Sequence, residues 1–332
     1  MSLTVTASNT QFTFDEELFA LALENEPDLV RNAMVNSGAM VEDAYIASLI
    51  ANGGNFYTCP FYNELADGDE DNYDGATDIT VDESTGSEQS GVVFGRAKAW
   101  QAPQFIADFT TARPMEAIAA RVNKWHATQT QKRIIGITDA VLGIDDLADH
   151  AVTKDSLDEN TLSDATQEIW GDNKDGIVMA IMHSAVAQEF EDLNRTNFLK
   201  YTDATGFTKT VRTIEVNGIL CIIDDGMPYS AGDSGTTYDT YLFGAGALRH
   251  AAAPVTLPVE THREPLTLGG VDLIITRYRE TIHPNGLSFV KPSTMGTSPT
   301  DDELSDSANW ALAWSDPQAV LIGKMTTPGH EA

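Results

Sequence analysis

The feature that most constrains this chain is a long acidic stretch enclosed by strand-forming residues. Positions Glu64 to Glu88 hold ten acidic residues and no basic ones. The alternating run Thr77-Asp78-Ile79-Thr80-Val81 and the segment from Val92 to Trp100 predict two strands. A hairpin this polar has little to bury against its own body. It is therefore predicted to project and to lie on a neighbouring copy of the chain, which favours assembly over catalysis.

A long amphipathic helix is predicted to follow the hairpin, beginning at Pro114. Apolar residues recur there at three- and four-residue steps, up to Trp125 and Ile135. A helix of about twenty residues or more spans roughly 30 Å. Two shorter helices are predicted before the hairpin, over Phe14–Leu23 and Val41–Ile50.

The rest of the chain predicts one more helix and a series of strands. An acidic connection from Asp145 to Ser163 leads to a helix that is predicted to begin near Asp175. Its apolar face would hold Val178, Ile181, Met182, Ala185, Val186, Phe190 and Leu193. Strands are predicted over Thr210–Val216, Ile219–Asp224, Tyr238–Phe243, Val271–Ile282, Leu287–Val290 and Ala319–Met325.

Composition and charge exclude several classes of protein. With 332 residues and 42% hydrophobic content, the chain can form a sizeable core in one or two domains. Its formal net charge is −30, and Arg31 is the only basic residue before Arg96. Such a surface repels nucleic acids and anionic membranes within a Debye length of about 8 Å. Sequence-specific nucleic-acid binding and membrane binding are therefore not expected.

Cysteine usage and targeting signals point to a protein made in a cytoplasm. Cys59 and Cys221 are too few for a disulfide framework and form no CxxC pair. The N-terminal sequence has no basic region followed by an apolar core, and no run of 18 apolar residues suggests a membrane span. Both cysteines are expected to be reduced and structural.

One short motif resembles the nucleophile segment of trypsin-like serine proteases. It is Gly232-Asp233-Ser234-Gly235, in which Ser234 would be the nucleophile. Those enzymes also need a histidine base and a glycine that shapes the oxyanion hole. Here Thr236 stands at the position of that glycine, and the surrounding Ser, Gly and Asp residues predict a turn. A hydrolase that uses Ser234 is kept only as an alternative.

The acidic stretch could also suggest a calcium loop. With Gly75 at the sixth position of an EF-hand, the twelfth position is Val81, where a bidentate Glu is required. An EF-hand is therefore excluded, whereas loose binding of divalent cations at the surface stays open. The candidate ligands in that alignment are Glu70, Asn72 and Asp74.

No other pattern predicts a chemical site. The histidines form no HxH or HExxH pair, and each is expected at the surface or in a structural hydrogen bond. No glycine-rich phosphate loop is present either. Hence no catalytic, cofactor-binding or metal-binding residue and no cofactor is predicted. The histidines are His126, His150, His183, His250, His262, His283 and His330.

The order of these parts resembles the major capsid proteins of tailed bacteriophages, which have the Hong Kong 97-like capsid fold. The resemblance covers residues from about 40 to 328. It is carried in the first half by Ala97-Lys98-Ala99-Trp100, Arg113–Ala119, Lys124-Trp125 and Gln131-Lys132-Arg133 before Gly136-Ile137. In the second half it is carried by His183–Val186, Gly218-Ile219, Asp224–Pro228, Tyr238–Ala247, Arg277–Leu287 and Ala308–Trp310.

The resemblance implies an α+β fold with an extended E-loop hairpin, a peripheral domain built on a long spine helix, and an axial domain whose β-sheet is flanked by helices. Its order along the chain would be an N-terminal arm with short helices (1–54), the E-loop (55–104), the peripheral domain with the spine helix (105–162), the axial domain (163–270), return strands to the peripheral domain (271–295) and the C-terminal part of the axial domain (296–332).

The function implied by the resemblance is self-assembly, as hexamers and pentamers, into an icosahedral shell around the genome of a tailed bacteriophage. Expected partners are other copies of the chain, a portal and a separate scaffolding protein, with decoration proteins left open. DNA would be enclosed without sequence-specific binding, in a virion whose subunits are made in the cytoplasm of the bacterial host. Nothing identifies residues for covalent cross-links. An encapsulin-like compartment shell that encloses cargo is the main alternative.

Overall fold

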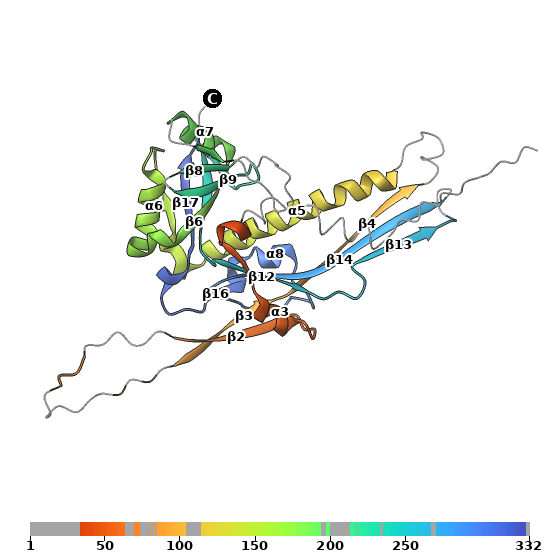
Figure 1. Cartoon of the computed structure of the whole chain (residues 1–332), viewed down its shortest axis with the longest axis horizontal. Coiled ribbons are helices and arrows are strands. Elements are labelled where there is room, and N and C mark those ends of the chain that lie inside the picture. Colours follow the sequence, from red (N-terminus) through yellow and green to blue (C-terminus); the bar gives the residue numbers. More distant parts are fainter. Residues whose placement is uncertain are drawn as a thin grey trace, which may run out of the picture. The chain divides into compact units, whose positions relative to one another are not determined.

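The computed structural model shows an α+β protein (Figure 1). It describes residues 34–63, 70–73, 81, 83, 85–103, 114–193, 197–199, 213–216, 218–232, 235–266 and 270–329. The chain divides into two compact units. Unit 1 comprises Met1–Asp28, Gly95–His126 and Val255–Tyr278, and unit 2 comprises Leu29–Phe94, Ala127–Pro254 and Arg279–Ala332.

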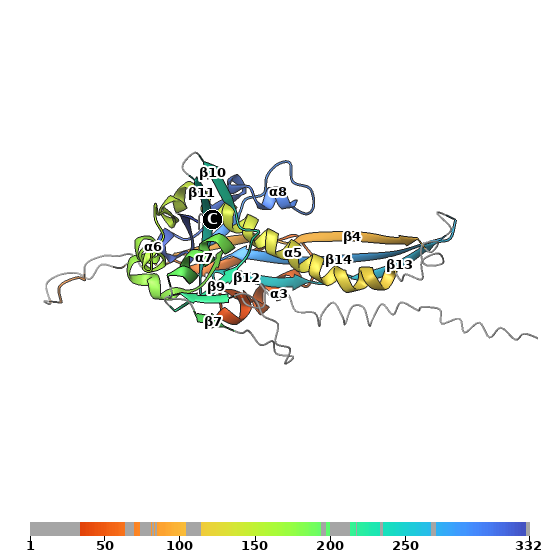
Figure 2. The ribbon, with the colours of Figure 1, turned by 90° about the horizontal axis from the view of Figure 1, so that it is seen from above.

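Unit 1 combines long strands with the first half of a long helix (Figure 2). Strand β14 (Val271–Pro284) begins here and pairs antiparallel with β13 (Val259–Glu264), while β4 (Phe94–Pro103) also pairs with β14. Helix α5 (Pro114–Leu142) has its first half in this unit, where His126 Nε2 lies 3.2 Å from Thr276 Oγ1 of β14. Helix and strands therefore pack together within the unit.

The main sheet of unit 2 has its strands in the order β5-β17-β11-β6-β9-β8-β7, with β10 paired to β11. Its central strand β6 is an unbroken apolar run because both of its faces are covered. Met179 and Ile181 pack in one core cluster, and Ala180 and Met182 in another. The strands are β5 (Ala151–Thr153), β6 (Ile177–Met182), β7 (Asn197–Leu199), β8 (Thr213–Val216), β9 (Ile219–Ile223), β10 (Tyr229–Gly232), β11 (Gly235–Gly244) and β17 (Ile322–Pro328).

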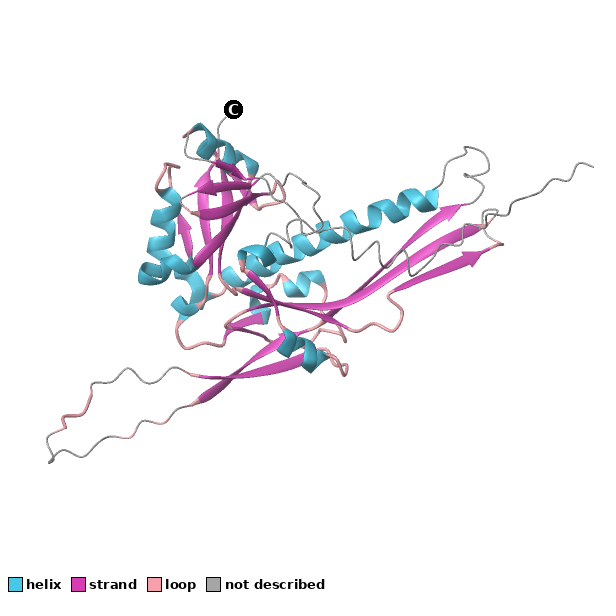
Figure 3. Ribbon diagram, viewed as in Figure 1, coloured by secondary structure: helices cyan, strands magenta, loops and turns pink. Residues whose placement is uncertain are grey.

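Helices supply the other layers of these two clusters (Figure 3). The second half of α5 contributes Ile134 and Ile137 to the cluster around Met179. On the opposite face, α6 (Thr161–Trp170) and α7 (Ser184–Asp192) contribute their buried side chains to the cluster around Ala180. The sheet of unit 2 is thus flanked by helices on both faces.

A second group of strands in unit 2 joins the N-terminal part of the chain to the end of β14. Strand β12 (Leu248–Ala253) pairs antiparallel with β14 and parallel with the short strand β1 (Met40–Glu42). Helix α3 (Ala44–Ile50) follows β1 directly, because the Asp43 side chain accepts hydrogen bonds from the first free N–H groups of the helix. The remaining elements are η1 (Asp145–His150), η2 (Gly171–Gly176), β15 (Leu287–Phe289), α8 (Asp301–Leu304), η3 (Ser307–Asn309), β16 (Trp310–Leu312) and η4 (Pro317–Ala319).

The predicted spine helix is confirmed, with its start at Pro114 and a length of 29 residues. The strands predicted between Ile219 and Met325 are also present, with small shifts at their ends. The prediction missed β12 and β13, whose sequences are rich in Ala or in charged residues. The helix predicted over Phe14–Leu23 lies outside the described residues.

The helix predicted from Asp175 is wrong. Residues Ile177–Met182 form β6, and the helix begins only at Ser184, after the His183 side chain has accepted a hydrogen bond from the Ala185 N–H. A short apolar run that is buried on both faces has the same pattern in a strand as in a helix. The helix predicted over Val41–Ile50 is likewise too long, because Val41 belongs to β1.

The acidic connection predicted from Asp145 to Ser163 is also more regular than expected, since it contains η1, β5 and the first turn of α6. Among the described helices, none is both long and apolar enough to cross a membrane.

Candidate functional site

The predicted hairpin is present, but its strands are not those that were predicted. Strand β2 (Phe56–Tyr62) pairs antiparallel with β3 (Gly86–Val92), from Phe56 opposite Val92 to Tyr62 opposite Gly86. Of the strand predicted over 77–81, Val81 is described and is not in a strand, and the other residues lie outside the described part. The aromatic and β-branched residues of β2 were the signal that the prediction missed.

The base of this hairpin belongs to the core of unit 2. Tyr57 is 6% exposed, and its hydroxyl lies 2.9 Å from Thr281 Oγ1, which in turn donates to the Val92 carbonyl at 2.8 Å. Burial raises the pKa of Tyr57 above its usual range, so the phenol stays protonated and can donate. A Cβ on Gly91 would lie 2.2 Å from the Tyr57 ring, so only glycine fits opposite it.

Strand β3 is also tied to β15. The Gly286 N–H donates to Gln89 Oε1 at 3.1 Å, and the Ser90 N–H donates to Ser288 Oγ at 3.1 Å. Gln89 is 3% exposed. The paired part of the hairpin therefore reaches back to Gly86, and the polar tip ends before that residue.

The described residues beyond the paired strands face solvent. The last hydrogen bonds of the hairpin join Asn63 and Thr85, through the backbone and through both side chains at 2.9 Å each. Tyr73 is 94% exposed and Val81 84%, and Tyr62, the last residue of β2, is 86% exposed. The hairpin thus divides into a buried base and an exposed, acidic tip.

Unit 1 differs from the rest of the chain in its charge. In a chain of net charge −30, two of its three segments, Gly95–His126 and Val255–Tyr278, together carry more basic than acidic residues. Lys98, Arg121 and Lys124 are exposed, and Lys98 Nζ lies 5.9 Å from the centre of the Trp125 ring. The seven basic residues are Arg96, Lys98, Arg113, Arg121, Lys124, Arg263 and Arg277, and the five acidic ones are Asp108, Glu116, Glu260, Glu264 and Asp272.

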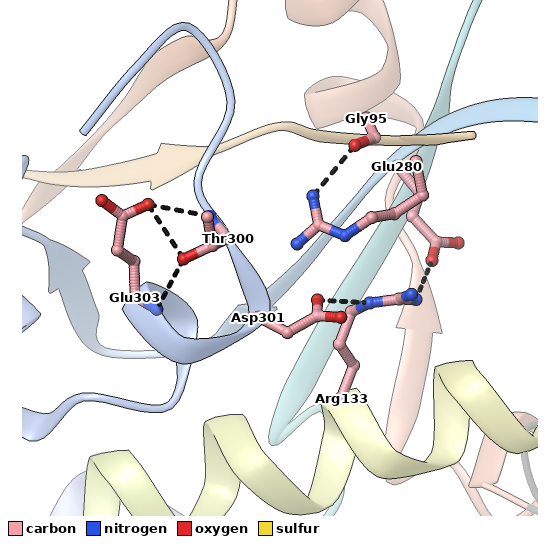
Figure 4. Close-up of polar contacts among 7 residues, drawn as sticks. Gly95, Arg133, Glu280, Thr300, Asp301 and Glu303 are labelled. Carbon is pink, nitrogen blue, oxygen red and sulfur yellow. Dashed lines mark hydrogen bonds and ion pairs between the residues drawn. The ribbon is translucent and has the colours of Figure 1, made fainter. Parts of the chain in front are cut away.

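A buried group of charges fastens α5 to neighbouring elements of unit 2 (Figure 4). Arg133 is 5% exposed, and its Nε donates to Asp301 Oδ1 at 2.9 Å while its Nη1 lies 3.5 Å from Glu280 Oε1. The guanidinium also lies 5.2 Å from the centre of the Phe94 ring. Breaking such a pair costs about 3–5 kcal/mol when it leaves a buried charge alone.

Local structure explains why Asp301 is available to Arg133. It is the first residue of α8, where Thr300 Oγ1 accepts from the Glu303 N–H at 3.1 Å and Glu303 Oε2 accepts from the Thr300 N–H at 2.8 Å. This reciprocal capping fixes the start of the helix. Figure 4 shows Asp301 and Glu280 at the two sides of the guanidinium.

The candidate nucleophile lies outside the described residues, as do Asp233, Asp74 and Gly75. Gly232 and Gly235 pair with each other at the end of β10 and β11, in agreement with the predicted turn. Glu70 and Asn72 are exposed. Within the described part of the chain, no three His, Cys, Asp or Glu side chains gather as a metal site.

One histidine contradicts the expectation for this residue type. His283 is 1% exposed, and neither of its ring nitrogens has a hydrogen-bond partner among the described residues. Burial, assisted by the charge of Arg249, lowers its pKa to about 3, so the ring is neutral. It lies against Tyr57 at the hairpin base, with 6.0 Å between the ring centres. His330 lies outside the described residues.

Comparison with solved structures identifies the class of protein that this fold defines. The capsid of Ralstonia phage GP4 matches with a TM-score of 0.58, at 9% identity, over 89% of this chain and 88% of that one. The acidic stable capsid of Helicobacter pylori bacteriophage KHP30 matches with a TM-score of 0.53, at 12% identity, over 88% of each chain. The fold is therefore the Hong Kong 97-like fold of bacteriophage capsids.

Sequence comparison identifies the family. The chain is 30% identical, over 299 residues, to the major capsid protein of Bacillus phage SPP1, covering 88% of this chain and 89% of that protein. No family model matches the sequence. The chain belongs to the family of bacteriophage major capsid proteins. It is a structural protein of the virion that associates with copies of itself to form the capsid shell, and it is not an enzyme.

Proposed function

We propose that this chain forms an icosahedral shell of hexamers and pentamers in which the β2–β3 hairpin of one copy lies on unit 1 of a neighbouring copy. The observation that carries this proposal is the division of the hairpin. Its base is buried at Tyr57, whereas Tyr62 at the outer end of β2 and Tyr73 in the tip are almost completely exposed. Aromatic side chains of this kind are enriched at protein interfaces, where they bury much area at a low entropic cost.

Charge supports unit 1 as the receiving surface. The segment from Glu64 to Glu88 carries ten acidic residues and no basic ones, whereas the segments Gly95–His126 and Val255–Tyr278 of unit 1 carry a small excess of basic residues. Complementary charge steers two surfaces together and disfavours other pairings. The exposed Lys98, Arg121 and Lys124, with the Trp125 ring near Lys98, offer groups that suit carboxylates and tyrosines.

The proposal extends to the other components of the particle. We infer a portal, a separate scaffolding protein and synthesis in the host cytoplasm, with DNA enclosed by a shell whose net charge of −30 per subunit does not retain it. Each contact of the hairpin can be weak, because many copies act together in a closed shell. The same proposal divides the chain, after residues 54, 104, 162, 270 and 295, into the N-terminal arm, the E-loop, the peripheral domain, the axial domain, the return strands and the C-terminal part of the axial domain.

The test replaces the tip and leaves the base intact. In this variant, Glu64–Ser84 becomes Asn-Gly, a two-residue turn that suits the hydrogen-bonded positions of Asn63 and Thr85. Its free energy of unfolding should stay within about 0.5 kcal/mol of the original, since no described core contact is removed. Closed shells should be absent in electron micrographs. Normal shells from this variant would overturn the proposal.

A second variant tests the charge of the tip separately from its length. It keeps the length of the tip but changes each of its Asp and Glu residues to Asn or Gln. The change lowers the general repulsion between subunits, which alone would speed assembly. We expect slower assembly at low salt instead, measured by light scattering, because docking on unit 1 is weakened. Lys98→Gln, Arg121→Gln and Lys124→Gln together should slow assembly in the same way, without an additive effect when combined with the neutral tip. Additive effects would argue against contact between the two surfaces.

A further inference from the structure

The charged group around Arg133 continues to a histidine that is enclosed by two carboxylates. His250 of β12 is 1% exposed. Its Nδ1 lies 2.8 Å from Glu42 Oε2 of β1, and its Nε2 lies 3.2 Å from Glu280 Oε2 of β14. The other oxygen of Glu280 lies 3.5 Å from Arg133 Nη1. A row of alternating charge thus runs from Asp301 of α8 to Glu42 of β1.

This geometry favours a doubly protonated imidazole. A neutral ring has one N–H donor and one lone pair, so it can donate to one carboxylate only. Both nitrogens of His250 lie at hydrogen-bond distance from glutamate oxygens, and with both glutamates ionised each contact is a hydrogen bond only when both nitrogens carry a proton. The carboxylates lie at different ring nitrogens and do not converge on one point, so the arrangement does not suit a metal ion.

We propose that the attachment of β1 depends on the protonation of His250. As an imidazolium, His250 holds β1 to the sheet through Glu42, and loss of one proton releases that strand. The inference concerns the attachment of β1 and does not depend on how the hairpin docks. The proton therefore controls how firmly β1 is joined to the neighbouring strand β12.

The two carboxylates are not equivalent, and this decides which contact is lost. The Glu280 side chain is 10% exposed and also bonded to Arg133, so it cannot move to solvent without leaving buried charges unpaired. The Glu42 side chain is 50% exposed and can turn to water. After deprotonation, the single N–H of His250 should therefore remain with Glu280.

Strand β1 is short enough to respond to the loss of one contact. It has three residues, stands at the end of its sheet order and pairs with β12 alone among the described strands. Val41 is 45% exposed, so only Met40 and Glu42 connect it to the interior side. A hydrogen bond between charged groups is among the stronger local contributions that such a strand can have.

Other charges near His250 stay constant in the range where it would titrate. Arg249 and Asp43 form a pair at 3.4 Å, and His283 lies opposite Arg249 on β14. Alternation along β12 places these groups on the other face of the sheet. The guanidinium groups of Arg249 and Arg133 keep their charge, and the low pKa of His283 keeps it neutral, so these neighbours do not change between about pH 6.5 and 9.

The first measurement is the nitrogen NMR spectrum of the histidine rings in the full-length, unassembled subunit. The signals of His250, assigned through loss in His250→Gln, should show two protonated nitrogens at about pH 7 and change only at higher pH than those of the exposed His262. In Glu42→Gln, which keeps the shape but removes the charge, that change should move to lower pH. A ring that is neutral at pH 7 and insensitive to Glu42→Gln would overturn the proposal.

The second measurement tests release of the strand by hydrogen exchange. Protection of the β1 amides, normalised to β6 to remove the intrinsic effect of pH, should fall about tenfold between about pH 6.5 and 9. In Glu42→Gln the normalised protection should already be low and should not depend on pH. This half-exposed substitution should leave the fold intact. Protection of β1 that is independent of pH in the unmodified chain would mean that His250 has no such role.

Discussion

Two tyrosines on one strand show how differently the two ends of the hairpin behave. Tyr57 and Tyr62 both lie on β2, five positions apart, yet one is 6% exposed and the other 86%. Tyr57 packs with Cys59, Ile46 and Val93 and forms a hydrogen bond to Thr281. The structure gives Tyr62 no comparable surroundings within its own subunit. The same residue type therefore serves folding at the base and is free for assembly at the tip.

The strongest test of this comparison is Tyr57→Ala. Removing a buried aromatic side chain costs about 3–5 kcal/mol, because the cavity collapses only in part. The Thr281 hydroxyl would also lose its partner. We expect a large loss in the free energy of unfolding, measured by urea denaturation of the unassembled subunit. If Tyr57→Ala folded normally and failed only in assembly, the base would not be part of the core.

A smaller effect on the free energy of unfolding is expected from His283→Met, which tests how acid affects the buried end of the hairpin. The ordinary histidine pKa is 6.5, and that of folded His283 is about 3. Below pH 6.5 the His283 ring takes up a proton in the unfolded chain but stays neutral in the folded chain. Its contribution to the free energy of unfolding is therefore fully present above that pH and is lost as the pH falls toward 3. The loss is on the order of a few kcal/mol.

In His283→Met this acid-dependent loss should shrink, while stability at neutral pH changes by less than about 1.5 kcal/mol. Thermal unfolding curves between about pH 7 and 4 measure both quantities. His262→Met, a change on the partly exposed strand β13, is the matched control and should retain the original pH dependence. An unchanged acid response in His283→Met would show that other groups cause it.

The smallest effect on folding is expected from Tyr62→Ala. A surface substitution of this kind changes the free energy of unfolding by no more than about 0.5 kcal/mol. Assembly, followed by light scattering, should nevertheless slow, because an exposed aromatic anchor is removed from the tip. Unchanged assembly together with unchanged folding would place the interface elsewhere on the hairpin.

The parts that could be predicted from the sequence are those with a local signal. Pro114 and the apolar repeat after it gave the start of α5, and the polar segment between Glu64 and Glu88 gave the presence of a hairpin, although not its strands. The error at Ile177–Met182 has the opposite origin. Its burial on both faces comes from α5 on one side and α6 and α7 on the other, and the predicted pattern joined the strand to α7, which follows it at Ser184.

The charged contacts could not have been predicted at all. Arg133 and Glu280 are 147 positions apart, and His250 and Glu42 are 208 apart. Each residue alone has the ordinary appearance of a surface charge. Only the pairing of β12 with both β1 and β14 brings the histidine and the two carboxylates together.

The row of charges from Asp301 through Arg133, Glu280 and His250 to Glu42 has a consequence for the history of the family. A single substitution in the middle of the row leaves one neighbour with an excess of charge in a place where water cannot compensate it. Evolution can therefore pass through few viable intermediates. We expect related capsid proteins to keep these positions as a set or to replace them as a set, with apolar residues where the charges have gone.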